Sequence, residues 1–90
     1  MRVEFDGEEL SAVINKKQHS IKLIDNTGLP YITCTKYVEG LDLEEDQVLI
    51  KNYSENEGVL NALIEAGIVT PAERLVRVGH GWLHLCRFTF

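Results

Sequence analysis

Apolar and polar residues alternate along most of the chain, and this period-two pattern is typical of β-strands with one buried face. Residues 2–6 and 9–15 alternate most clearly, and the other segments predicted as strands are residues 20–25, 29–36, 47–51, 74–79 and 82–89. Turn-forming residues such as Gly7, Gly28 and Gly79 lie between them. The first four segments follow one another through short turns, so they predict a meander of antiparallel hairpins.

Residues 52–68 depart from this alternation and carry the pattern of a helix. The apolar positions that share one helical face are Val59, Leu60, Leu63 and Ile64. Ser54 is suited to cap the amino end, and Glu57 three residues later completes a capping box. Gly67 suits the left-handed position just past the carboxyl end. The pattern therefore predicts a helix over residues 55–66.

Gly58 is unexpected in this helix, because glycine in a helix interior costs roughly 1 kcal/mol relative to alanine. Close packing of a neighbour such as Tyr53 over the glycine explains its presence. Close approach of a ligand to the backbone is the alternative explanation. Ser54, Glu55 and Glu57 already supply the hydroxyl and the negative charge that a helix amino end favours, so no anion site is expected there.

Together the elements predict a single α+β domain over residues 1–90, with an antiparallel sheet of about six or seven short strands and one helix packed on a face. The last strand carries apolar residues on both faces, Trp82, Cys86, Phe88 and Phe90 on one and Leu83 and Leu85 on the other. It is therefore expected to be central or well covered. A partly closed barrel is the alternative architecture. Exposed sheet edges would allow a homodimer by strand addition.

The charge and the cysteine content narrow the class of protein. A formal net charge of −5 opposes direct binding of nucleic acid, which depends on lysine and arginine neutralising phosphates. Two cysteines are too few for a disulfide framework, and the chain has no signal-peptide pattern, so reduced thiols in a cytoplasm are expected. No apolar run approaches the ~18 residues that a membrane span needs, and no cofactor is expected.

The richest cluster of chemically versatile side chains is His80, His84 and Cys86. Its spacing matches no common zinc pattern, and Cys34 could complete it only if its strand lay adjacent. A core cysteine with partly exposed histidines is the simpler interpretation, so no metal site is predicted. There is no Gly-rich phosphate loop, nucleophile elbow, HExxH or CxxC motif. The paired carboxylates lie in loops, and the chain is therefore predicted not to be an enzyme.

The motif Asn-Tyr-Ser-Glu-Asn-Glu-Gly at residues 52–58, followed by Leu60, Leu63 and residues 66–69, resembles a family of small uncharacterised bacterial proteins also found on phages and other mobile elements. The acidic loop before the motif and the start of the chain at residues 5–7 resemble that family too. The resemblance covers roughly the second half of the chain and carries no catalytic residues. It implies a cytoplasmic accessory protein of a mobile element that acts by binding, for example by inhibiting a host defence protein.

Two functional hypotheses follow. The first is a non-enzymatic protein-binding module, for example a phage or mobile-element inhibitor of a host protein. In this module an acidic patch binds a basic partner. Its candidate contact residues are Asp42, Glu44, Glu45, Asp46, Tyr53 and Asn56. The alternative is a small-ligand or nucleotide binder that sequesters a signalling molecule, since aromatic faces stack on bases and arginine meets phosphate. Its candidate residues are Tyr53, Gly58, Trp82, His84 and Arg87.

Overall fold

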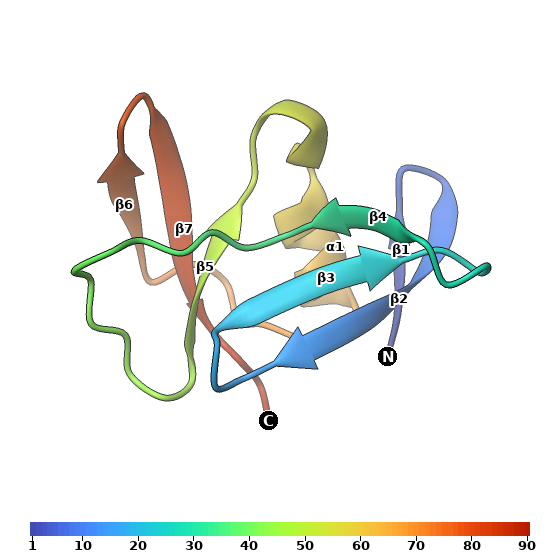
Figure 1. Cartoon of the computed structure of the whole chain (residues 1–90), viewed down its shortest axis with the longest axis horizontal. Helices are drawn as coiled ribbons and strands as arrows, with labels where there is room; N and C mark the ends of the chain where they lie inside the picture. The colour runs from blue at the N-terminus through green and yellow to red at the C-terminus, as the bar shows by residue number, and fades with distance from the viewer.

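The computed structural model describes all of residues 1–90 and contains seven strands and one α-helix (Figure 1). The strands are β1 (Arg2–Phe5), β2 (Glu8–Asn15), β3 (Ser20–Ile24), β4 (Pro30–Thr33), β5 (Gln47–Lys51), β6 (Arg74–Val78) and β7 (Gly81–Arg87). They form two antiparallel sheets, with the orders β1-β2-β3-β4 and β5-β7-β6. The predicted α+β class and strand number are confirmed, but the strands divide between two sheets instead of forming one.

The segment that follows β4 joins the two sheets. Cys34 donates its backbone N–H to Ile21 of the four-stranded sheet at 2.9 Å, and Lys36 donates to Leu49 of the three-stranded sheet at 3.3 Å. Between them, Thr35 forms an isolated bridge with Ile50. Residues 34–38, called the crossover segment below, therefore leave one sheet and pair with the other, as the ribbon shows (Figure 1). This is why β4 ends earlier than the alternation predicted.

The apolar faces of the two sheets and the helix enclose the larger of two hydrophobic cores. Its fully buried side chains include Leu10, Ile21, Leu23, Val48, Ile50 and Leu63. A smaller core lies on the other face of the three-stranded sheet, where Val38, Leu41 and Leu43 pack against Leu49, Leu83 and Leu85. Both faces of β7 are thus covered and β7 is the central strand of its sheet, as its two apolar faces predicted.

The helical region begins differently from the prediction. A 3₁₀ turn, η1 (Ser54–Asn56), precedes the α-helix α1 (Val59–Glu65), and no side chain caps either one at its N-cap residue. Ser54 has φ +57°, which is unlike the extended backbone of a capping residue. The side chain of Asn52 caps the amino end of α1 instead, since its Oδ1 accepts the backbone N–H groups of Gly58 at 3.2 Å and Leu60 at 3.0 Å.

Gly58 separates the two helical pieces. It lies directly before α1 with φ +93°, a left-handed conformation that interrupts a continuous helix and that glycine adopts without steric cost. A β-carbon there would lie 3.8 Å from Phe5 Cε1, so the neighbour of Gly58 is Phe5 and the predicted packing of Tyr53 over it is wrong. The predicted single helix over residues 55–66 is corrected accordingly.

The carboxyl end of α1 matches the prediction. Gly67 has φ +75°, and its N–H donates to Ile64 at 3.0 Å while that of Ile68 donates to Leu63 at 3.0 Å. This pair of hydrogen bonds is a Schellman motif, which satisfies carbonyl groups that the helix end leaves free. No helix of the structure has the length and apolar character needed to cross a membrane.

Candidate functional site

A pocket of about 610 Å³ opens beside the β6–β7 hairpin, where the chain leaves β5 and the crossover segment passes. The residues that line it are Lys36, Asn52, Tyr53, Val78, Gly79, His80, Gly81, Trp82 and His84. We call it the hairpin pocket. Its volume lies in the ordinary range of small-molecule sites. None of its lining residues is acidic, although the chain has 14 acidic and 9 basic residues, so the pocket favours neutral or anionic ligands.

Tyr53 forms one wall of the hairpin pocket and is held by two contacts. Its ring packs on Gly81, where a β-carbon would lie 3.1 Å from Tyr53 Cζ. In addition, Lys51 Nζ lies 5.4 Å from the ring centroid, a cation–π distance. Tyr53 is only half-buried in spite of these contacts, so part of a fixed aromatic ring remains available to a ligand.

Trp82 contributes the second aromatic surface. It pairs with Arg77 across β6 and β7, and Arg77 Cζ lies 5.5 Å from the centroid of the indole ring. The guanidinium group orients the ring and leaves Trp82 48% exposed. A large aromatic side chain that is both oriented and exposed is well suited to stack on a planar ligand.

His84 brings an unsatisfied polar atom to the same pocket. It lies on β7 opposite Ile50 of β5 and Leu75 of β6. Its Nδ1 is buried and has no hydrogen-bond partner in the protein. A buried polar atom without a partner costs free energy. His80, at the tip of the hairpin, is exposed.

The structure brings together three of the five residues predicted for small-ligand binding, namely Tyr53, Trp82 and His84. The other two lie elsewhere: Gly58 is beside Phe5, and Arg87 is at the far end of β7, opposite Gln47. The prediction missed Lys36, Asn52 and His80, which also line the pocket. No sequence pattern places Lys36 beside the β6–β7 hairpin, because its position depends on the crossover between the sheets.

The acidic loop is largely occupied by contacts within the protein. Arg87 Nη2 donates to Glu44 at 2.7 Å and Nη1 donates to Asp46 at 2.6 Å, while Nε donates to Glu73. The hydrogen bonds to Glu44 and Glu73, with the charge of Asp46, raise the pKa of Arg87 well above its usual range. Two of the four carboxylates predicted to meet a partner are therefore already paired.

The remaining residues of the predicted partner-binding set have different environments. Asp42 and Glu45 are exposed and take part in no ion pair. Asn56 is 1% exposed and donates its Nδ2–H to the backbone oxygen of Thr33 at 2.7 Å, so it is a structural residue and not a surface contact. Tyr53 belongs to the hairpin pocket. The six residues do not form one continuous surface.

The cysteines and histidines do not gather into a metal site. No group of three or more histidine, cysteine, aspartate or glutamate side chains is placed to hold a metal ion. Cys34 and Cys86 are both free and buried. Burial raises the pKa of the Cys34 thiol to about 12, and burial with the nearby charge of Glu73 raises that of Cys86 to about 11. Both thiols are thus protonated and unreactive at neutral pH.

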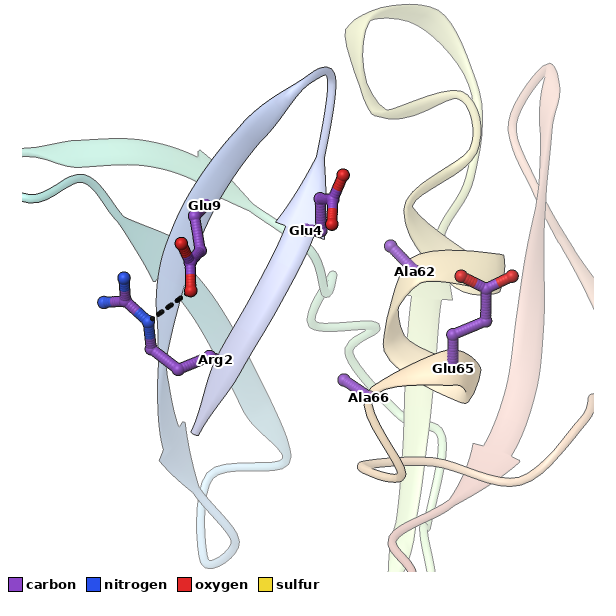
Figure 2. A pocket seen from close by; sticks show the side chains of 6 residues that line it. All are labelled: Arg2, Glu4, Glu9, Ala62, Glu65 and Ala66. Carbon is purple, nitrogen blue, oxygen red and sulfur yellow. Dashed lines mark hydrogen bonds and ion pairs between the residues drawn. The ribbon is translucent and has the colours of Figure 1, made fainter.

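A second pocket of about 320 Å³ lies between β1 and α1 (Figure 2). It is lined by Arg2, Glu4, Glu9, Ala62, Glu65 and Ala66. Figure 2 shows the two alanines on the side of α1 that faces β1, and Arg2 paired with Glu9, whose Nε–Oε1 distance is 3.2 Å. With three carboxylates and one arginine that is already paired, this pocket repels anions and offers little apolar surface. It is therefore a weaker candidate than the hairpin pocket.

Comparisons with family models, with curated proteins and with solved structures give no match to this chain. The resemblance at residues 52–58 to proteins of phages and mobile elements stays a prediction. The case for a function rests on the geometry and chemistry of the pockets.

Proposed function

We propose that this protein is a non-enzymatic binding module that holds a planar, anion-bearing small molecule such as a nucleotide in the hairpin pocket. The observation that supports this proposal is the arrangement of Tyr53, Trp82 and His84 around a pocket without a carboxylate. In a cytoplasm, such a module would sequester a signalling nucleotide.

Each lining group has a defined role in this proposal. The rings of Tyr53 and Trp82 stack on the planar part of the ligand. Lys36 attracts its anionic group, because an ammonium group hydrogen-bonds strongly to phosphate or carboxylate oxygens. Asn52 Oδ1 is already used by the amino end of α1, so its Nδ2–H₂ is the group left to donate to the ligand. His84, which also lines the pocket, forms the remaining polar contact.

Trp82 provides a direct test, because it is the only tryptophan in the chain. Titration with a panel of mononucleotides should quench its fluorescence in a saturable way, and the matching nucleosides without phosphate should bind more weakly. Lys36→Gln should weaken binding about tenfold, since a hydrogen bond to a charged group contributes roughly 1.5–3 kcal/mol. His84→Ala should also weaken it.

Arg74→Gln is the control, because Arg74 is exposed, lines no pocket of the structure, and both changes remove one positive charge. Its affinity should equal that of the unmodified protein. The proposal fails if no nucleotide gives a saturable change in fluorescence. It also fails if Arg74→Gln and Lys36→Gln weaken binding equally, because the attraction would then be non-specific.

A protein partner bound through the acidic loop is the second candidate function, and it includes inhibition of a host protein by a phage or mobile-element product. Its supporting observation is that Arg87 fixes the loop through Glu44 and Asp46 while Asp42 and Glu45 stay exposed. A loop that is already ordered binds at lower entropic cost.

The test of this second function is affinity capture from a bacterial lysate with the unmodified protein and with the double variant Asp42→Lys/Glu45→Lys. A protein that the unmodified chain retains and the double variant loses would support it. Equal recovery by both chains would remove the loop from consideration.

A further inference from the structure

A second carboxylate-free pocket, of about 460 Å³, lies between the turn that joins β2 to β3 and the start of the crossover segment. It is lined by Lys17, Gln18, His19, Ser20, Lys22, Thr33, Thr35 and Tyr37. We call it the lysine pocket. Every one of these side chains carries an N–H or O–H group that can donate a hydrogen bond, and none is a carboxylate. A pocket lined by two lysines and no carboxylate contrasts with the net charge of −5 of the whole chain.

The strand register places several of these donors together. Lys22 of β3 pairs with Thr33 of β4, so the ammonium and the hydroxyl lie on the same face of the sheet. Thr35, on the crossover segment, accepts the backbone N–H of Ile21 at 3.2 Å. That contact uses an oxygen lone pair and leaves the hydroxyl hydrogen of Thr35 free to donate.

His19 has a fixed orientation beside these donors. Its Nδ1 lies 2.7 Å from the backbone oxygen of Gln47. A carbonyl oxygen can only accept, so Nδ1 carries a proton and donates it to this contact, which fixes the ring orientation. The contact joins the β2–β3 turn to β5 and holds one side of the lysine pocket in place.

The positive charges of the lysine pocket are not used inside the protein. The five ion pairs of the structure involve the basic residues Arg2, Lys51 and Arg87 only. Lys17 and Lys22 are exposed and have no acidic partner. Two unpaired ammonium groups beside several hydroxyl donors match a ligand that accepts many hydrogen bonds and carries negative charge.

We propose that the lysine pocket binds the phosphoryl group of a small phosphorylated molecule. A phosphoryl group presents only acceptor oxygens and negative charge, which complements a lining that has two ammonium groups, several hydroxyl donors and no carboxylate. The pocket is larger than one phosphate ion needs, and Tyr37, 82% exposed at its rim, offers surface to the rest of the molecule. This site shares no lining residue with the hairpin pocket and stands independently of the function proposed for it.

The test is a titration of ¹⁵N-labelled protein followed by NMR, with inorganic phosphate and a sugar phosphate as probes and ionic strength held constant with sodium chloride. Saturable chemical-shift changes should be confined to the amides of residues 17–22 and 33–37. Lys17→Gln and Lys22→Gln should each weaken binding about tenfold. Both lysines are exposed, so the variants should keep the spectrum of a folded protein.

Arg74→Gln is the control, because Arg74 lines neither pocket and the change removes one positive charge. Unchanged affinity of this variant for the sugar phosphate supports the proposal. Tighter binding of the sugar phosphate than of inorganic phosphate identifies an organic ligand, and the reverse order identifies the free ion; both outcomes support a phosphoryl site. Shifts that sodium chloride reproduces, or equal losses in all three variants, would overturn it. Much tighter, steeply salt-dependent binding of a single-stranded oligonucleotide would also overturn the small-molecule assignment.

Discussion

The ring of Tyr53 rests against Gly81 so closely that a β-carbon at Gly81 would lie 3.1 Å from Tyr53 Cζ. Gly81 does not have a positive φ, so the fold depends on its small size and not on its backbone freedom. The contact ties the β6–β7 hairpin to the chain that leaves β5. It therefore fixes one wall of the hairpin pocket.

Gly81→Ala is expected to lower the free energy of unfolding by about 1 kcal/mol, because overpacking at a close contact costs roughly 1–3 kcal/mol and this neighbour is a half-buried ring. Denaturant unfolding of the single variants and of the pair with Tyr53→Ala would measure the coupling. In the Tyr53→Ala background the alanine should cost almost nothing. An equal cost in both backgrounds would mean that the ring is not what the alanine displaces.

Asn52→Ala should destabilise the protein by about 1–2 kcal/mol, because Asn52 Oδ1 accepts two backbone N–H groups at the start of α1 and loss of a helix cap costs that much. Asn52→Asp keeps an acceptor oxygen and should recover most of the loss. Ser54→Ala is the matched control and should change stability by less than about 0.5 kcal/mol. A larger loss in Ser54→Ala than in Asn52→Ala would restore the capping box that the sequence predicted.

Arg87→Gln should lower the free energy of unfolding, since it leaves three carboxylates without their shared partner, although each exposed ion pair contributes little. Arg87→Lys should not restore the loss, because lysine lacks the planar fork that reaches Glu44, Asp46 and Glu73 together. Arg2→Gln breaks the exposed pair with Glu9 and should have almost no effect. Thermal unfolding at low and high salt would separate the three variants.

The buried thiols predict a loss of stability at alkaline pH. The pKa values of Cys34 and Cys86 rise from 9.0 to about 12 and about 11 on folding, so above pH 9 the unfolded chain releases protons that the folded chain keeps. The stabilisation is complete below pH 9 and is lost as the pH rises through 11 and 12.

The difference in stability between the unmodified protein and Cys34→Ala/Cys86→Ala, followed from pH 8 to pH 11, would measure this effect and cancel the titration of other groups. The difference should shrink as the pH rises. A constant difference would mean that the thiols ionise equally in the folded and unfolded chains. A thiol reagent should also react slowly with the native protein and rapidly with the denatured one.

Some features of this protein follow from short-range sequence signals alone. Alternation of apolar and polar residues predicted strands such as β1 and β2, because a strand with one buried face repeats every two residues. Apolar residues on successive positions predicted β5 and β7, whose two faces are covered. Gly67 determined the end of α1, because only a residue that tolerates a positive φ completes the Schellman motif. The burial of Cys86 followed from its place in a strand with apolar residues on both faces. All of these signals act over a few neighbouring residues.

Other features were decided by tertiary structure. The division into two sheets depends on residues 34–36 pairing with both, and nothing local specifies a second partner for that strand. The cap of α1 comes from Asn52, six and eight residues before the N–H groups it binds, whereas capping patterns look three residues ahead. Arg87 pairs with Glu44, which lies 43 residues earlier in the chain. This ion pair removes both side chains from the binding surfaces that the sequence predicted.

The two candidate sites belong to this second group. The hairpin pocket joins Lys36 to Trp82 and the lysine pocket joins Lys17 to Thr35, and each pair is brought together by the crossover segment. The sequence by itself determined which side chains could serve as stacking surfaces and cations. Only the path of the chain between the two sheets decided which of them became neighbours, because long-range backbone pairing fixes positions that local patterns leave free.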